Sequence, residues 1–357
     1  MSRRARLGFW AAAGGALAAG LATGVAGERT VVRAQRRQPD PLARTGFGPL
    51  PATRQSTVPA DDGVALHVEE VGDLDAPLTI IFSHGYTLEM ACWWFQRLAL
   101  GDLGRLVFWD QRAHGRSGAS PAEQDTIDQL GSDLLRVLEA TAPTGDVVLV
   151  GHSMGGMTVM AVADQRPDLF GETGRVCGVA LIGTSAGQLA SVTFGLPRLA
   201  GALVAKVYPR ATAMMGRRAS LVDRRRTAGM GSDVSYALTR RLSFGPGAPP
   251  SLVDFMERMI AATPAQVISD FASTFLSHDK LAALDALTGV EVLVLCGDQD
   301  ALTPVEHSRA IAAALPAAEL VVLPGAGHMV MLERPALVDL HLRALVTRAR
   351  ERVAART

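Results

Sequence analysis

The sequence has few cysteines and no excess charge of either sign, and each shortage excludes a class of protein. The three cysteines, Cys92, Cys177 and Cys296, are odd in number and lie far apart, which does not fit a disulfide framework. No CxxC pair or histidine cluster indicates a metal site, so we expect three buried, small apolar residues. Lys plus Arg and Asp plus Glu both total 35, so no overall field would attract nucleic acid.

Long apolar runs are also scarce, and the clearest one is at the N-terminus. Residues 8–27 carry no charge, follow three arginines, and as a helix would span about 30 Å. Most of them are Ala and Gly, so three interpretations stay open: a cleaved export signal, an uncleaved membrane anchor, or an Ala-rich helix that never meets lipid. We expect possible membrane association through residues 8–27 and a protein that is membrane-anchored or exported to the cell envelope. Arginines flank the segment on both sides, so the positive-inside rule does not choose its orientation.

The composition of the rest is that of a globular protein. Apolar residues make up 48% and charged residues 20%, which is enough to bury a large core. We divide the chain into a leader and linker at 1–59, a first core part at 60–185, a helical insertion at 186–277 and a second core part at 278–357. Residues 37–59, rich in Pro, Arg and Thr without periodicity, are predicted to be the linker.

Short apolar runs alternate with helical patterns through the predicted core. The runs are at residues 78–82, 106–109, 147–150, 176–182, 292–296 and 320–323. Between them, residues 127–140 carry leucines and an isoleucine close to 3.6-residue spacing. This alternation predicts an α/β fold, with a mainly parallel sheet that is covered by helices on both faces.

The alternation breaks at residues 186–277, where no convincing strand occurs. The segment contains five methionines, several phenylalanines and many arginines. The apolar residues suit either a flexible wall for acyl chains or the packing of the insertion's own core. The arginines form either a solvated face or a surface for anionic lipid.

A candidate nucleophile follows the run at 147–150. Residues Gly151 to Gly155 match the pattern G-x-S-x-G, and residues 157–165 are predicted to be a helix. A serine on a tight turn between strand and helix leaves no room for side chains two positions before and after it, which explains both glycines. We therefore predict that Ser153 is a nucleophile at a helix N-terminus, rather than an incidental serine in a glycine-rich turn.

A serine nucleophile needs a base, and the base needs an acid. Among eight histidines, His328 alone follows a predicted strand in a glycine-rich loop, and the other seven have structural explanations. Asp298 and Asp300 both follow the run at 292–296. We favour Asp300 as the acid, because it precedes a turn toward the site, and we expect Asp298 to bind backbone amides of the turn.

Acyl transfer also needs N–H donors for the oxyanion. One is expected to be the backbone N–H of Met154, the residue after the nucleophile. The other is expected from the loop after the run at 78–82, where Gly85 lets the backbone turn and leaves the Tyr86 N–H as donor. The ring of Tyr86 is predicted to be either a wall or a lid.

Five motifs in this order resemble the α/β-hydrolase superfamily, and within it the esterase, lipase and non-haem haloperoxidase-like group. They are His84 to Tyr86, Asp110 to Ser117, Gly151 to Gly155, Gly297 to Asp300, and Gly327 with His328. The resemblance implies the α/β-hydrolase fold, a Ser-Asp-His order of the catalytic residues, a structural role for residues 110–117, and a helical cap formed by the insertion. Relatives that are dehalogenases or epoxide hydrolases carry Asp where this chain has Ser153, and proline iminopeptidases carry an HGGPG loop that is absent here.

The predicted function is hydrolysis of carboxylic esters of small hydrophobic substrates through an acyl-enzyme, without cofactor or metal. Two alternatives remain open. The same three residues can support perhydrolysis, the chemistry of haloperoxidase-type enzymes, and a hydrolase scaffold can also serve as a non-catalytic binding protein.

Overall fold

The computed structural model describes residues 32–189, 192, 214, 216–220, 223–224 and 233–356. The predicted membrane segment at 8–27 lies outside these residues, as does much of the predicted insertion between residues 190 and 232. Within the described part of the chain, no helix combines the length and apolar character needed to cross a membrane.

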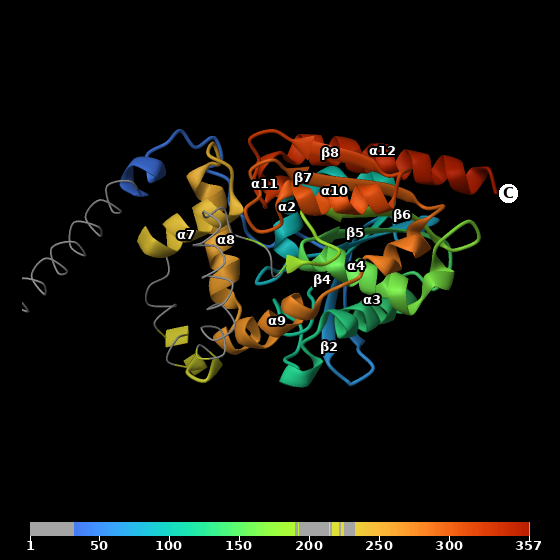
Figure 1. The fold of residues 1–357 in the computed structure, drawn as a ribbon, viewed down its shortest axis with the longest axis horizontal. Helices are drawn as coiled ribbons and strands as arrows, with labels where there is room; N and C mark the ends of the chain where they lie inside the picture. The colour runs from blue at the N-terminus through green and yellow to red at the C-terminus, as the bar shows by residue number, and fades with distance from the viewer. Residues whose placement is uncertain are drawn as a thin grey trace, which may run out of the picture.

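A single sheet of eight strands forms the centre of the molecule, in the order β1-β2-β4-β3-β5-β6-β7-β8 (Figure 1). All neighbouring pairs from β4 to β8 are parallel, and β2 runs antiparallel to both of its neighbours. Every predicted apolar run is a strand. The strands are β1 (Arg54–Pro59), β2 (Ala65–Gly72), β3 (Leu78–Ser83), β4 (Arg105–Trp109), β5 (Asp146–His152), β6 (Val176–Ile182), β7 (Glu291–Gly297) and β8 (Glu319–Leu323).

Helices cover both faces of the sheet, because successive side chains along each buried strand point to opposite faces. In β3, Ile80 and Phe82 pack with α12 (Pro335–Ala354) and α2 (Trp94–Ala99), whereas Ile81 packs with α3 (Ile127–Thr141), α4 (Met154–Gln165) and α10 (Val305–Ala314). Burial on both faces accounts for the continuous apolar runs of the central strands.

The prediction of a linker at residues 37–59 is wrong for its last six residues. Residues 54–59 form β1, an edge strand whose antiparallel register with β2 pairs Thr57 with His67. The sequence of β1 is mostly polar and ends in proline, and only Val58 is buried along its length. An edge strand makes hydrogen bonds on one side only and needs few apolar residues, so its pattern resembles that of a loop.

The described part of the insertion is helical. It contains α7 (Asp233–Ser243), α8 (Pro250–Ala262) and α9 (Ala265–Ser277), between β6 and β7 in the chain. Figure 1 shows α7 and α8 at one side of the sheet, next to residues 32–47. We call residues 233–277, which comprise these three helices and the turns that join them, the cap. The chain also forms α11 (Val330–Glu333) and 3-10 turns at Met90–Trp93, Gly101–Leu103, Ala122–Gln124, Pro167–Leu169 and Ala282–Leu287.

Candidate active site

Ser153 lies in the tight turn between β5 and α4. Its φ angle is 53°, in the left-handed region that residues other than glycine rarely adopt. A Cβ on Gly151 would lie 2.3 Å from the carbonyl oxygen of Gly155, and one on Gly155 would lie 2.2 Å from that of Ser83. The two glycines thus allow the strained turn that presents a serine at the end of a strand.

The turn also places Ser153 at the N-terminus of α4. Met154 is the first residue of that helix, where backbone N–H groups have no partner within the helix. The aligned peptide dipoles of the helix favour negative charge at this end. The Met154 N–H therefore has the position and the electrostatic surroundings that an oxyanion donor requires.

His328 and Asp300 come together from two neighbouring strand ends. His328 follows β8 and Asp300 follows β7, and the distance from His328 Nδ1 to Asp300 Oδ2 is 2.8 Å. Both side chains are buried. In the neutral ring the Nδ1–H donates a hydrogen bond to the carboxylate, so Nε2 carries no hydrogen and can accept a proton.

The surroundings of the two aspartates differ. Asp300 accepts backbone N–H bonds from Leu302 and Thr303 at 2.9 and 2.8 Å, and a hydroxyl bond from Thr303 at 2.9 Å. These bonds fix the carboxylate that orients His328. Asp298 accepts a bond from the N–H of Gly325 at 2.7 Å and ties two loops together, whereas amides of its own turn were the expected partners.

Ser153 and His328 line one cavity of about 280 Å³ between the sheet and the cap. The cap contributes apolar side chains to its wall: Leu238 and Leu242 from α7, and Met256 and Ile260 from α8. Gly85 and Tyr86 line the same cavity, so the predicted oxyanion loop and the predicted nucleophile face a common space.

The side chain of Tyr86 is attached to the cap. Its hydroxyl donates a hydrogen bond to the carbonyl of Ile268 in α9, and its ring packs edge to face on Phe275 at 4.9 Å between centroids. His84, two residues before Tyr86, anchors the loop by accepting the Gln111 N–H at 2.9 Å. Burial lowers the pKa of His84 to about 3, so this imidazole is a neutral structural group.

A model of the alpha/beta hydrolase family matches residues 80–339. The chain is an alpha/beta hydrolase. It is 26% identical over 287 residues to the protein of Agrobacterium fabrum named "Putative carbamate hydrolase RutD", a match that covers 78% of this chain and 96% of that protein.

Solved structures agree with this assignment. A thermophilic esterase from Thermogutta terrifontis superimposes with a TM-score of 0.65 at 25% identity, covering 83% of this chain and 99% of that one. The enzyme Est816, described as degrading N-acyl homoserine lactones, superimposes with a TM-score of 0.60 at 25% identity, covering 81% and 99%. The predicted fold class and family resemblance are confirmed, and the protein is a hydrolase.

The sequence interpretation missed the contribution of His152 to the site of this hydrolase. The buried ring of His152 donates a hydrogen bond from Nε2 to the backbone carbonyl of His328 at 3.0 Å. Burial holds its pKa well below the usual value for histidine, so it remains a neutral donor. Its place beside Ser153 in the motif was the only signal, because the contact joins residues that are 176 positions apart.

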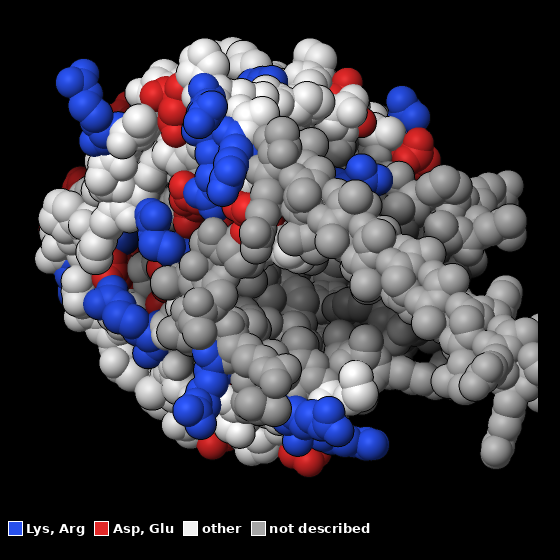
Figure 2. Space-filling view, turned by 90° about the vertical axis from the view of Figure 1, so that its left-hand side faces the viewer, with Lys and Arg blue, Asp and Glu red and all other residues white. Residues whose placement is uncertain are grey.

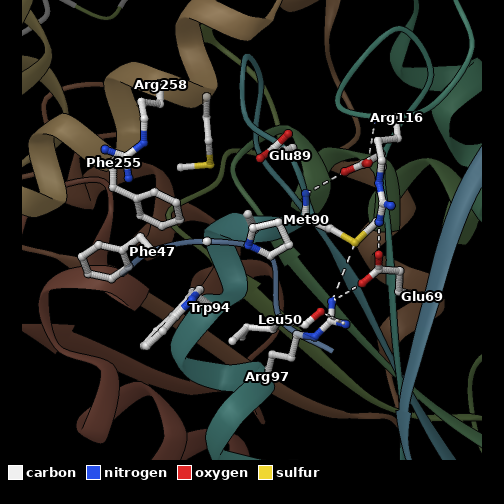
Figure 3. A pocket seen from close by; sticks show the side chains of 15 residues that line it. Phe47, Leu50, Glu69, Glu89, Met90, Trp94, Arg97, Arg116, Phe255 and Arg258 are labelled. Atoms are coloured by element: carbon white, nitrogen blue, oxygen red, sulfur yellow. Dashed lines mark hydrogen bonds and ion pairs between the residues drawn. The ribbon is translucent and has the colours of Figure 1, made fainter. Parts of the chain in front are cut away.

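The hydrolase has a second, larger cavity of about 410 Å³, lined in part by residues 89–91, which follow the residues 85–88 that line the first cavity (Figure 3). Phe47, Trp94 and Phe255 form its aromatic wall, and at its polar end Glu69 contacts Arg97 at 2.5 Å. Neither Ser153 nor His328 lines it. The candidate active site is therefore the smaller cavity, because the predicted nucleophile and the predicted base both line it.

Metal-binding groups are not gathered anywhere in the described ranges. No group of three or more His, Cys, Asp or Glu side chains among those residues is placed to hold a metal ion. Cys92, Cys177 and Cys296 are all buried and free, and they pack as small apolar residues, as predicted.

Proposed function

We propose that this hydrolase cleaves carboxylic esters of hydrophobic substrates through an acyl-enzyme intermediate. The observation that carries the proposal is the arrangement around the smaller cavity. Ser153 stands on a strained turn, and the buried pair of His328 and Asp300 lies against the same apolar space. This is the set of groups that nucleophilic acyl transfer requires.

The proposed reaction has two steps. His328 Nε2 takes the proton of the Ser153 hydroxyl as Oγ attacks the ester carbonyl, and the alcohol leaves with that proton. The N–H groups of Met154 and Tyr86 donate to the oxyanion of each tetrahedral intermediate. Water, deprotonated by His328, then attacks the acyl carbonyl, and the bond to Ser153 Oγ breaks as His328 returns the proton to that oxygen and the acid leaves.

The cap supports the substrate class. Leucine, isoleucine and methionine side chains from α7 and α8 line the cavity together with three Ser and Thr residues of α7, and the apolar part of this lining suits an apolar acyl or alcohol group. The names of the relatives widen the range to lactones, which are cyclic esters, and carbamates, which the same nucleophile can attack. We place linear carboxylic esters first because they need no contact beyond the oxyanion donors and an apolar wall.

The test is a screen of p-nitrophenyl esters of increasing chain length, with an N-acyl homoserine lactone, an aryl carbamate and a peroxide-dependent halogenation assay alongside. We expect ester turnover to be highest, and Ser153→Ala to lose more than about a thousandfold in kcat/KM. A folded Ser153→Ala variant that keeps the wild-type ester turnover would exclude this nucleophile. Labelling of the wild type by a fluorophosphonate would argue against a non-catalytic binding protein.

We also propose membrane association through residues 8–27, aided by arginines near the cap. Figure 2 shows more Lys and Arg than Asp and Glu side chains on the face that carries α7, α8 and residues 32–47. Arginines at residues 32–47 and in the described part of the insertion are exposed: Arg33, Arg37, Arg44, Arg217, Arg218, Arg224, Arg241 and Arg258. Each basic residue near an anionic surface contributes about 1 kcal/mol of attraction.

Vesicle binding separates the two contributions. A chain that lacks residues 1–31 is expected to bind phosphatidylglycerol vesicles at low salt and to release them at high salt, and not to bind phosphatidylcholine vesicles. If the shortened chain does not bind phosphatidylglycerol vesicles, the arginines do not contribute to membrane binding. If the full chain binds neither kind of vesicle, residues 8–27 are not a membrane segment.

A further inference from the structure

Glu333 is a buried carboxylate close to the candidate active site that the proposed reaction does not use. It ends α11, five residues after His328, and it is only 8% exposed. Its Oε1 accepts the N–H of Gly327 at 2.7 Å, and its Oε2 accepts the N–H of Gly245 at 2.8 Å. Gly327 directly precedes His328, and Gly245 follows α7 of the cap. One carboxylate therefore joins the loop of the base to the cap.

The two segments joined by Glu333 are in direct backbone contact. The N–H of Met329 donates to the carbonyl of Ser243 at 2.9 Å. A Cβ on Gly327 would lie 2.6 Å from the carbonyl carbon of Phe244, and a Cβ on Gly245 would lie 2.1 Å from the carbonyl oxygen of Gly325. No side chain fits between the loop and the cap, so the position of one segment determines the position of the other.

We infer that Glu333 is a positioning residue that holds His328 in register with Ser153 and fixes the cap against the loop of the base. The inference rests on the proposed function of Ser153 and His328. From the sheet side, His152 already holds the carbonyl of His328. Glu333 supplies the matching restraint from the cap side, so that the backbone of the base is held on both sides.

This role requires the ionised form of Glu333. A carboxylate accepts strong hydrogen bonds on both oxygens, whereas an amide turns a donor toward one of the two N–H groups and a carboxylic acid leaves that N–H only the weaker acceptor of a hydroxyl oxygen. The hydrogen bond of that N–H is then lost or weakened in a buried place, which costs free energy and pushes the segments apart. Protonation of Glu333, or its replacement by Gln, is therefore expected to loosen the loop of His328.

The burial of Glu333 places its protonation near neutral pH. Burial raises the pKa of Glu333 to about 7, against the two backbone N–H bonds and Arg334, which favour the ionised form, while the charge of Asp300 raises it further. Arg240 of α7 is occupied by the carbonyls of Ala248 and Pro246. Acid thus protonates Glu333 and releases the restraint that it places on the loop of His328.

The experiment compares Glu333→Gln with Asp339→Asn on p-nitrophenyl ester hydrolysis. Asp339 is a matched control, because its pKa is also raised by burial but its partner is Gln96, outside the site. At pH 8.5 we expect Glu333→Gln to lower kcat about 10- to 100-fold, as a small misplacement of a catalytic group does, with KM within about threefold. Asp339→Asn is expected to keep the wild-type kcat.

The pH profile separates positioning from a general loss of structure. Below about pH 7 the wild-type kcat is expected to fall by a component that Glu333→Gln lacks, because protonation of Glu333 has the same effect as its replacement. The ratio of the wild-type kcat to the Glu333→Gln kcat is therefore expected to shrink between pH 8.5 and about pH 6. An unchanged kcat and an unchanged ratio would overturn the inference, and so would a wild-type kcat that does not fall over this range, which can be measured even if the variant does not fold. If Ser153→Ala is inactive and Glu333→Gln is unaffected, the proposed function holds and only the inference about Glu333 fails. If Ser153→Ala is active, the proposed function and the inference both fail.

Discussion

Asp300 has four hydrogen-bonding contacts that fix its carboxylate: two backbone N–H groups, the hydroxyl of Thr303 and the Nδ1–H of His328. Only the last of these contacts carries the proposed chemistry, and the others hold the oxygen atoms in place for it. An amide at this position keeps the shape but turns a donor toward the ring. His328 would then lose the tautomer in which Nε2 accepts a proton.

We therefore expect Asp300→Asn to lower kcat by about 10³- to 10⁴-fold, with a much smaller change in KM. Asp298→Asn is the matched control, because it removes the same charge two residues away and its partner is the Gly325 N–H rather than the base. Steady-state kinetics on one ester measures both. An equal loss in the two variants would show that the charge of this loop, and not the orientation of His328, is what matters.

The positions of residues in local motifs could be predicted from the sequence, and contacts between residues far apart in the chain could not. Ser153, Asp300 and His328 each follow a buried strand in a recognisable turn, and the structure brings the last two into contact. His152 and Glu333 act through backbone groups that the fold alone brings near them. The partner of Glu333 in the cap, Gly245, is 88 positions away in the chain.

The turn between β5 and α4 is the element on which the nucleophile depends. At Gly155, a Cβ would meet the carbonyl of Ser83 in β3, which is backbone and has little freedom to move. We expect Gly155→Ala to lower the free energy of unfolding by about 1 to 3 kcal/mol, the usual cost of an overpacked core, and to lower ester turnover as well. Urea unfolding measures the first quantity.

Gly46→Ala is the control for that experiment, because a Cβ there would have no atom within 4 Å. Its free energy of unfolding is expected to stay within about 0.5 kcal/mol of the wild type. Wild-type stability in Gly155→Ala would mean that the turn tolerates a side chain, and the steric explanation of the motif would fail.

The strands show why some elements could be predicted and one could not. The central parallel strands are buried on both faces and appear in the sequence as continuous apolar runs, so their positions agree with the structure to within a few residues. β1 lies at the edge of the sheet and buries one residue of six, so nothing in RQSTVP separates it from a loop.

At the scale of the whole molecule, residues 32–50 pack across the cap and connect it to the core. Arg36 forms an ion pair with Asp254 at 2.8 Å, Asp40 accepts the N–H of Ser251 at 2.8 Å, and Phe47 stacks on Phe255 at 4.7 Å between centroids. These contacts all reach α8, whose other residues line the smaller cavity. The sequence suggested a linker here because the stretch has no periodicity of its own.

Removal of residues 1–50 is therefore expected to lower the melting temperature by about 4 °C or more relative to removal of residues 1–31. Phe47 is partly buried, and the loss of its packing alone is worth about 1 to 2 kcal/mol. The shorter truncation is the control, because it leaves every contact named above intact. Equal melting temperatures for the two chains, measured by calorimetry, would show that this segment does not stabilise the cap.

The most direct measurement is the identity of the residue that becomes acylated. The wild-type protein is incubated with a fluorophosphonate, digested, and analysed by mass spectrometry. We expect one adduct, on the peptide that contains Ser153, and none in folded Ser153→Ala. An adduct on another residue, or no adduct in a folded wild-type protein that still hydrolyses esters, would contradict the assignment of Ser153 as the nucleophile.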